Sequence, residues 1–201
     1  MKNDLKSEFR KICLNLNKHN KYYYSKKIGW EIYKIAKNHQ KILFFIPMKN
    51  EVDIHWVIRK LKMEKKSVFV PFMQDLSFKM VKYSLPLAKK KFSILEPLNK
   101  NETLEKIDLA IVPIVGIDSD FKRIGFGKGM YDRFFARLKY RPKIVFVQLK
   151  PCVSKTKLTD GYDIKADEYI SFNIRRKNDN RNYSRFFFIR SRGFYYSQED
   201  G

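Results

Sequence analysis

The sequence predicts an α/β fold of three layers, in which a mostly parallel central sheet lies between two layers of helices. Short, nearly continuous apolar segments such as 107–112 and 143–149 alternate with segments whose apolar residues recur at helical spacing. Strands that are apolar on both faces are typical of parallel sheets covered by helices on both sides. A chain of 201 residues is long enough to form one domain with a substantial core.

Each predicted helix carries apolar residues three and four positions apart, which places them on one face of the helix. The predicted helices contain residues 4–17, 28–36, 53–65 and 130–138. Asp53 precedes the apolar series of the third helix and is its expected N-cap, since a carboxylate can accept a hydrogen bond from a free N–H group of the first turn.

The predicted strands are short apolar segments that end at Pro, Gly or polar residues. They contain residues 41–46, 67–71, 78–83, 107–112, 143–149 and 169–174. The strand at 78–83 is expected in a more exposed excursion, and residues 84–104 are expected to form a loop with short elements. We therefore predict a single domain over residues 1–174, with 169–174 as its last strand.

Residues 175–201 differ in composition and are predicted to form a basic, aromatic C-terminal tail. They contain six arginines, three consecutive phenylalanines at 186–188 and two tyrosines at 195–196. Interleaved basic and aromatic residues can bind single-stranded RNA through charge and stacking. A packed strand followed by a free end explains the same composition, and we favour that explanation.

The net charge of +22 indicates an affinity for polyanions. It admits a nucleic-acid-binding protein as the alternative function. However, the lysines are spread over the whole chain, and frequent Lys, Asn, Ile, Phe and Tyr are expected from an AT-rich genome. Because only clustered charge makes a nucleic-acid footprint, we favour compositional bias with a polyanionic ligand and expect no specific nucleic acid.

The remaining composition points to a cytoplasmic protein. No apolar run approaches the roughly 20 residues that span a bilayer, and the first residues lack the apolar core of a signal peptide. Cys13 and Cys152 are too few for a disulfide framework, so we expect them to be reduced. The three histidines show no spacing typical of metal ligands.

Gly125, Gly127 and Gly129 alternate in a loop between a predicted buried strand and a predicted helix. Without Cβ atoms, these residues allow positive φ angles and let the backbone come close to a ligand. The unpaired N–H groups and the dipole at the start of the helix favour an anion. The segment therefore predicts a phosphate-binding site rather than a purely structural loop.

Charged residues in and beside this loop strengthen that prediction. Arg123 and Lys128 add positive charge, and Asp132 offers the hard oxygen ligand that magnesium prefers. The spacing fits neither the Walker A motif, which requires G-x-x-x-x-G-K followed by Ser or Thr, nor the dinucleotide motif G-x-G-x-x-G.

Residues 123–133, which read R-I-G-F-G-K-G-M-Y-D-R, resemble the motif R-x-G-x-G-x-G-Y-Y-D-R of the 5-formyltetrahydrofolate cyclo-ligase family. Residues 6–11 resemble the family's K-x-x-L-R-K, with a second possible register that begins at Lys2. Residues 46–53 resemble the family's segment that ends in E-V-D. Residues 94–97 resemble its element G-I-x-E-P, and residues 163–167 resemble its late motif D-x-x-x-D. These similarities occur in the family's order and span residues 6 to about 172.

The chain departs from the family's motifs at three positions. Ile114 follows Val-Pro where the family usually has Gly. Lys128 replaces the commoner middle glycine, although some members of the family also carry lysine there. Met130 replaces the first of two tyrosines, which removes an aromatic ring that could stack on the pterin. A thioether can still pack against such a ring.

The resemblance implies an ATP- and Mg²⁺-dependent ligase that converts 5-formyltetrahydrofolate to 5,10-methenyltetrahydrofolate through a phosphorylated formyl intermediate. The implied catalytic residues are Arg123, Lys128 and Tyr131. The implied ATP site contains Lys6, Arg10, Arg123, Ile124, Gly125, Phe126, Gly127, Lys128, Gly129, Met130 and Tyr131. The implied folate site contains Ile46, Glu51, Phe126, Gly127, Lys128, Gly129 and Met130. The implied metal ligands are Asp132 and Asp167.

Because ligands of α/β sheets bind beyond the carboxyl ends of the strands, we expect these segments to converge there. Several side chains also have a purely structural explanation. Lys6 and Arg10 are four residues apart and suit a solvated helix face, Asp132 suits a helix N-terminus, and Asp167 suits a turn. Glu51 could pair with a lysine. The expected ligands are 5-formyltetrahydrofolate and ATP, and the expected state is a monomer without membrane attachment.

Overall fold

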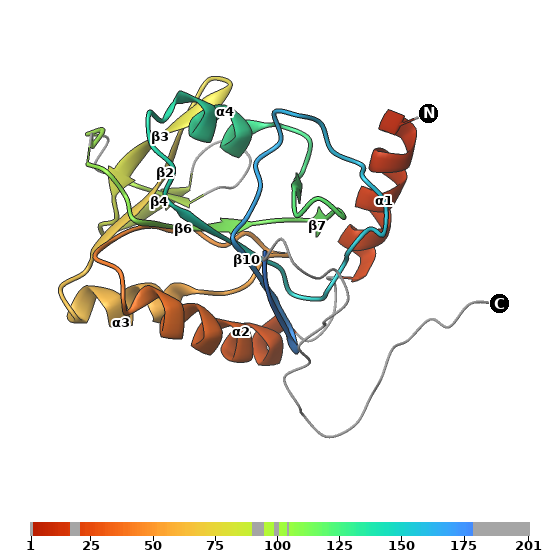
Figure 1. Ribbon diagram of the computed structural model, residues 1–201. Helices are drawn as coiled ribbons and strands as arrows, with labels where there is room; N and C mark the ends of the chain where they lie inside the picture. The colour runs from red at the N-terminus through yellow and green to blue at the C-terminus, as the bar shows by residue number, and fades with distance from the viewer. Residues whose placement is uncertain (1, 17–20, 90–94, 99–100, 104, 179–201) are drawn as a thin grey trace.

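The computed structural model describes residues 2–16, 21–89, 95–98, 101–103 and 105–178. It confirms the three-layer α/β architecture: a seven-stranded sheet lies between helices (Figure 1). The strand order is β11-β10-β9-β6-β1-β2-β3. The strands are β1 (Lys41–Leu43), β2 (Ser67–Gln74), β3 (Ser77–Lys82), β6 (Leu109–Pro113), β9 (Lys143–Val147), β10 (Glu168–Ser171) and β11 (Ile174–Lys177).

The five inner strands are parallel, as the continuous apolar segments predicted. Ile42 is aligned with Val68 on one side and with Leu109 on the other. In the next pairs of the sheet, Ile111 is aligned with Val145 and Phe146 with Tyr169. This arrangement brings the segments that follow β1, β6 and β9 to the same edge of the sheet, where the candidate site lies.

The two edge strands are antiparallel and correct two expectations. β3 pairs with β2 along its whole length, and Phe78 is buried, so this strand belongs to the central sheet rather than to an exposed excursion. β11 pairs with β10 after a turn at Asn173, whose φ is +61°. Among the described residues the last strand is therefore β11, and it extends to Lys177, beyond the boundary predicted at residue 174.

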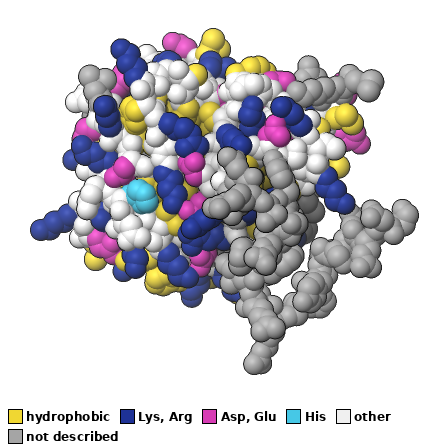
Figure 2. Space-filling view, viewed as in Figure 1, with side chains coloured by type: hydrophobic (Ala, Val, Ile, Leu, Met, Phe, Trp, Pro, Cys, Tyr) yellow, Lys and Arg dark blue, Asp and Glu magenta, His cyan; other side chains and the backbone are white. Residues whose placement is uncertain are grey.

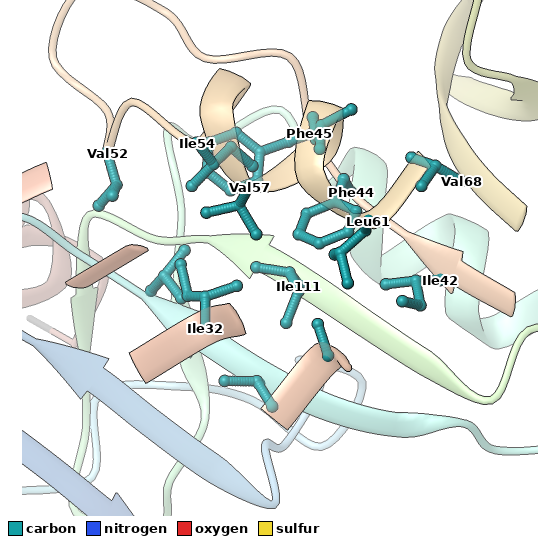
Figure 3. Close-up of a cluster of buried hydrophobic side chains, with 14 of the residues drawn as sticks. Ile32, Ile42, Phe44, Phe45, Val52, Ile54, Val57, Leu61, Val68 and Ile111 are labelled. Carbon is teal, nitrogen blue, oxygen red and sulfur yellow. The ribbon is translucent and has the colours of Figure 1, made fainter. Parts of the chain in front are cut away.

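The side chains of successive strand residues alternate between two cores, one on each face of the sheet. Ile42, Phe44, Ile111 and Val145 belong to the core covered by α2 (Lys21–Ala36) and α3 (His55–Met63) (Figure 3). Leu43, Ala110, Val112 and Phe146 face the core that holds Phe134 of α4 (Met130–Arg137). Because both faces are buried, the charged and other strongly polar residues of the inner strands stand at the strand ends.

The predicted helices form, but α2 begins at Lys21, seven residues before the predicted segment 28–36, and the other helices differ by one or two residues at their ends. α3 begins at His55 and its N-cap position is Ile54, so the prediction of Asp53 as N-cap is wrong by one residue. The Asp53 carboxylate still accepts a hydrogen bond from the His55 N–H (3.1 Å), and so stabilises the first turn. Within the described ranges, no helix is long and apolar enough to cross a membrane.

The segment 84–104 contains short elements, as expected. β4 (Leu87–Lys89) and β5 (Leu95–Pro97) form a separate antiparallel pair. Glu96, buried in β5, accepts a hydrogen bond from the Met73 N–H (2.9 Å) and so joins this pair to β2.

Helix α1 (Lys2–Leu16) stands beside the sheet rather than on one of its faces (Figure 1). It packs against the short hairpin of β7 (Gly116–Ile117) and β8 (Arg123–Ile124). A Cβ atom at Gly116 would lie 2.8 Å from the Phe9 ring and 2.9 Å from Cys13 Sγ, so this close approach requires glycine.

Cys13 and Cys152 form a disulfide between α1 and the segment that follows β9, which corrects the expectation of two reduced thiols. The two cysteines are 139 positions apart in the sequence, so their proximity depends on the whole fold.

Candidate active site

A cavity of about 460 Å³ lies between α1, the glycine loop, α4 and the segment 160–163. Its walls carry charges of both signs around an exposed backbone loop. The lining residues are Lys6, Arg10, Arg123, Gly125, Gly127, Gly129, Asp132, Arg133, Ala136, Asp160, Tyr162 and Asp163.

The three alternating glycines of the loop have different roles. Gly127 and Gly129 have φ angles of +95° and +59°, which disfavour any residue with a Cβ atom. Gly125 has no positive φ, but a Cβ atom there would lie 2.8 Å from the Arg123 guanidinium. The first glycine therefore makes room for a cation, and the other two shape the loop.

Gly129 occupies the N-cap position of α4 and has no side chain that could cap the helix. The unpaired N–H groups at the start of α4 therefore lie at the cavity wall, where they can donate hydrogen bonds to an anion. The Arg133 guanidinium donates to the carbonyl groups of Leu76 (2.6 Å) and Lys128, which holds the loop against the β2–β3 turn.

Arg123 and Asp132 form a buried ion pair at the base of the cavity. Arg123 Nη2 lies 2.7 Å from Asp132 Oδ2, and the two residues are 6% and 8% exposed. Asp132 Oδ1 accepts a hydrogen bond from the Ile164 N–H (3.2 Å). Arg123 Nε has no hydrogen-bond partner among the described residues, which is costly for a buried donor.

Helix α1 supplies two more cations from one face. Lys6 Nζ lies 2.8 Å from Asp163 Oδ2 and 3.8 Å from Asp160 Oδ2. Arg10 Nε donates to the Gly125 carbonyl (2.8 Å). The structure thus places Lys6 and Arg10 in the wall of the cavity rather than on a solvated face, and it favours the register of the opening motif that begins at Lys6.

The acidic wall of the cavity contains Asp160 and Asp163, which were not assigned from the sequence. The Asp160 N–H donates to Asp163 Oδ2 (2.8 Å), and Asp163 is 8% exposed. Asp163 was visible as the first aspartate of D-x-x-x-D, but nothing in the sequence indicated which of the two aspartates lines the cavity.

The structure does not bring Asp167 to the cavity, which corrects its assignment as a metal ligand. Its carboxylate accepts hydrogen bonds from the Arg141 guanidinium (2.8 and 3.0 Å) and from the Ile144 N–H (2.7 Å). Ile144 lies near the start of β9 and Asp167 immediately precedes β10. Asp167 therefore lies at the amino ends of these parallel strands, whereas ligands bind beyond the carboxyl ends.

Glu51 follows β1 and is buried, with an exposed fraction of 8%. Burial raises its pKa to about 7, although the Met48 N–H, which donates to Oε2 (2.9 Å), and the charge of Lys21 oppose the rise. Lys21 Nζ donates to the carbonyl groups of Met48 and Lys49 (3.0 Å each). The alternative explanation for Glu51, a pairing with a lysine, thus takes the form of a longer-range electrostatic attraction to Lys21.

Tyr131 lies near Arg123 of the cavity wall and is close enough to Glu51 to be affected by its charge. The centroid of its ring lies 5.0 Å from the centroid of the Phe78 ring and 5.2 Å from Arg123 Cζ. Burial, and to a lesser extent the Glu51 charge, raises the pKa of Tyr131 above its usual value. The phenol therefore stays protonated and can donate a hydrogen bond.

The other residues assigned to the site do not line the cavity. Ile124 is fully buried in β8, and Ile46 belongs to the core beneath α2 and α3. Met130 packs against the core beneath α4, and its carbonyl accepts from Ser77 Oγ (3.3 Å). Phe126 and Lys128 are exposed on the loop.

This combination of a glycine loop at a helix start, clustered cations and facing carboxylates suits an enzyme that binds a phosphorylated ligand together with a divalent metal. The profile of the 5-formyltetrahydrofolate cyclo-ligase family matches residues 2–149, which include α1, the glycine loop and α4. The chain therefore belongs to the 5-formyltetrahydrofolate cyclo-ligase family. Membership places it among the ligases of folate metabolism and implies a folate substrate.

Individual relatives agree with the family profile. The chain is 27% identical over 150 residues to a 5-formyltetrahydrofolate cyclo-ligase of Mus musculus (67% of this chain, 74% of the relative). It is 26% identical over 139 residues to one from Haemophilus influenzae (64% of this chain, 74% of the relative).

Two solved structures are also similar. A 5,10-methenyltetrahydrofolate synthetase of Aquifex aeolicus has a TM-score of 0.74 at 26% identity, with 90% of this chain and 97% of that chain covered. One from Mycoplasma pneumoniae, at 21% identity and a TM-score of 0.60, shares the fold and covers 83% of this chain and 97% of its own.

Proposed function

We propose that this chain converts 5-formyltetrahydrofolate to 5,10-methenyltetrahydrofolate, with ATP as co-substrate and Mg²⁺ as metal ion. The observation that carries the proposal is the cavity, in which four cations and the glycine loop face three aspartates. Such a cavity can neutralise a triphosphate and hold a metal ion on one side of it. The family supplies the identity of the folate.

The cations hold the triphosphate in this proposal. Lys6 and Arg10 approach from α1, Arg123 from β8, and the N–H groups of residues 129–131 from the start of α4. Lys128, at the tip of the loop, reaches the nucleotide from the solvent side. Phosphoryl transfer depends chiefly on positioning and on the neutralisation of charge, and these groups supply both.

The carboxylates of the cavity fit a magnesium site that is shared with the nucleotide. Among the described residues, no three His, Cys, Asp or Glu side chains are grouped so that they alone could hold a metal ion. Magnesium commonly takes one or two carboxylates and completes its octahedron with phosphate and water. We assign Asp132 and Asp163 as the carboxylates, with Asp163 in place of Asp167. A bound Mg²⁺ would neutralise charge on the triphosphate.

The folate is proposed to bind on the Glu51 side of Tyr131, next to Ile46 and Met130. Glu51, with a pKa of about 7, is present in both protonation states near neutral pH and can therefore either accept or donate a hydrogen bond to the pterin. Tyr131, whose ring lies 5.2 Å from the Arg123 guanidinium, can donate a hydrogen bond to the bound substrate. Phe126, exposed on the loop, offers an aromatic surface to the substrate.

The reaction joins the two regions. The formyl oxygen attacks the γ-phosphorus, the bond between that phosphorus and the bridging oxygen breaks, and ADP leaves. Nitrogen 10 of the folate then attacks the activated formyl carbon and loses its proton. The carbon–oxygen bond breaks, inorganic phosphate leaves, and the methenyl bridge remains. Arg123 and Lys128 stabilise the charge that is transferred with the phosphoryl group.

The proposal is tested by following the near-ultraviolet absorbance of 5,10-methenyltetrahydrofolate. Purified protein is expected to form this product from 5-formyltetrahydrofolate only when ATP and a divalent cation are both present. Product formation without ATP, or its absence in the complete mixture, would contradict the proposal. We also propose a monomer, which a measurement of molecular mass in solution checks. A cytoplasmic location stays a prediction for cell fractionation.

A further inference from the structure

Asp118 is a buried carboxylate next to the cavity that the proposed reaction does not use. It directly follows β7, is 1% exposed, and is not part of the cavity wall. A buried carboxylate is costly unless hydrogen bonds satisfy its oxygens. Both oxygens of Asp118 are satisfied, and each by a different segment of the chain.

The first oxygen closes the turn between β7 and β8. Oδ1 accepts hydrogen bonds from the N–H groups of Asp120 and Lys122, both at 3.1 Å. Within this turn Phe121 has a φ of +62°, a conformation that a residue with a side chain rarely adopts without such support. The turn leads directly into Arg123, so Oδ1 helps to place the cation at the base of the cavity.

The second oxygen holds the opposite wall. Oδ2 accepts from the N–H groups of Leu158 (3.1 Å) and Thr159 (3.0 Å), and from the hydroxyl of Thr159, which is fully buried. Asp160, in the acidic wall, is the next residue. Lys122 reinforces the link, because its Nζ donates to the Asp160 carbonyl (2.6 Å).

We propose that Asp118 is a positioning residue for the reaction proposed above. Its carboxylate joins the segment that carries Arg123 to the segment that carries Asp160 and Asp163, and so sets the separation of the cationic and acidic walls. This inference rests on the proposed function, since the two walls are those that hold the triphosphate and the metal ion.

All five groups that face Asp118 are donors, which explains why the position requires a carboxylate. Asparagine has the same size but replaces one acceptor oxygen by an NH₂ group, and this group would face N–H donors in either orientation. One of the two segments therefore loses its anchor in Asp118→Asn. The catalytic and binding side chains themselves remain unchanged in this variant.

The test compares Asp118→Asn with Asp120→Asn in the full chain. Asp120 lies in the same turn, but its carboxylate binds Lys157 (2.9 Å) at the surface, so the control removes one charge without touching the link. Calorimetric titration with a non-hydrolysable ATP analogue at several Mg²⁺ concentrations measures nucleotide affinity and metal requirement. Asp118→Asn is expected to weaken binding about tenfold or more and to raise the metal requirement. Asp120→Asn is expected to match the wild type.

A second pair of variants serves if Asp118→Asn does not fold. Thr159→Val removes one hydrogen bond to Oδ2, and Thr159→Ser retains it. We expect weaker binding of the analogue and a higher Mg²⁺ requirement for valine, and recovery for serine. Equal binding in the two Thr159 variants, or an Asp118→Asn variant that loses only thermal stability, would overturn the positioning role. A wild-type protein that forms no product but binds the analogue would instead contradict the proposed reaction.

Discussion

Asp132 combines a structural and a proposed catalytic role in one carboxylate. Its Oδ2 pairs with Arg123 and its Oδ1 accepts the Ile164 N–H, so it joins β8, α4 and the acidic wall. The sequence indicated the metal role from the motif and the capping role from the helix start, but it gave no sign of the buried pair. That pair changes what a substitution at this position does.

We predict that Asp132→Asn loses most of the turnover and also destabilises the fold. The substitution leaves the Arg123 charge buried without a counter-charge, which costs about 3 kcal/mol or more of unfolding free energy. Product formation and thermal melting measure the two effects. Asp163→Asn serves as the comparison, because Lys6 can still pair with Asp160, so it is expected to lose turnover with a smaller loss of stability. Equal melting temperatures for wild type and Asp132→Asn would contradict the buried pair.

Glu51 predicts a pH dependence of stability. The pKa of Glu51 rises from 4.5 in the unfolded chain to about 7 in the folded protein. Between pH 4.5 and 7, Glu51 is therefore protonated in the folded state and ionised in the unfolded state. The contribution of Glu51 to the free energy of unfolding is therefore most favourable below pH 4.5. It falls by an amount on the order of 3 kcal/mol as the pH rises to about 7.

Glu51→Gln is predicted to remove this dependence, because the amide does not titrate and its oxygen can still accept from the Met48 N–H. Urea unfolding of wild type and variant should diverge between pH 4.5 and 7, with the variant relatively more stable at the upper end. The surface variant Glu105→Gln provides the control. Parallel pH profiles for wild type and Glu51→Gln would show that Glu51 is ionised in the folded protein.

At the scale of elements, the apolar patterns predicted almost all of the helices and inner strands. The apolar segment 107–112 predicted an inner strand, and β6 (Leu109–Pro113) forms there with every residue buried. The edge strand β11 was missed because its residues Arg175, Arg176 and Lys177 resemble a charged tail. Arg175 is instead held by Glu168 (2.9 Å) and Glu31 (3.4 Å), partners that no local pattern reveals.

The position of α1 depends on contacts from distant parts of the sequence. Lys6 binds Asp163, Arg10 binds Gly125, and Cys13 is joined to Cys152. Lys6, Arg10 and Cys13 lie at positions i, i+4 and i+7, which share one face of a helix. The disulfide therefore fixes the same face that presents two cations to the cavity.

We predict that the double variant Cys13→Ala/Cys152→Ala is less stable and binds nucleotide more weakly. Loss of a link that closes a long loop typically costs about 2–4 kcal/mol, and a less firmly held α1 places Lys6 and Arg10 less precisely. Thermal melting and titration with a non-hydrolysable ATP analogue measure both effects. Dithiothreitol should shift the wild type towards the variant and leave the variant unchanged. A reductant effect of equal size on both proteins would exclude the disulfide as the cause.

The candidate site was predicted unevenly, for a physical reason. Seven of the residues that line the cavity were assigned from the sequence, because the glycine loop, Asp132 and the helix-borne cations have local motifs. Asp160 and Asp163 of the cavity wall were not assigned from the sequence, and neither was the buried Asp118. Their roles depend on how the segment 158–163 packs against the β7–β8 turn. The sequence assigned Asp167 rather than Asp163 for the same reason: spacing alone does not show which carboxylate lines the cavity.

At the scale of the whole molecule, the basic residues that give the charge of +22 are spread along the whole sequence. On the face shown in Figure 2, Lys and Arg side chains lie scattered among acidic and uncharged ones. Residues 179–201 contain four arginines and three acidic residues, so they account for one unit of the net charge. We therefore expect any affinity for nucleic acid that depends on charge to come mainly from residues 1–178 rather than from residues 179–201.

We predict that any binding of RNA or DNA is independent of sequence and weakens steeply from low to physiological salt, because it depends on counterion release. A chain truncated after Asn178 is expected to keep most of this binding, the same salt dependence and the ATP-dependent reaction. Truncation after Asn173 also removes β11 with its ion pairs to Glu168 and Glu31, so only this shorter chain should melt at a lower temperature. Fluorescence anisotropy with an unrelated pair of oligonucleotides, together with melting curves, distinguishes these outcomes. Sequence-selective, salt-resistant binding that disappears after truncation at Asn178 would show that stacking by the aromatic tail, rather than net charge, makes this protein bind nucleic acid.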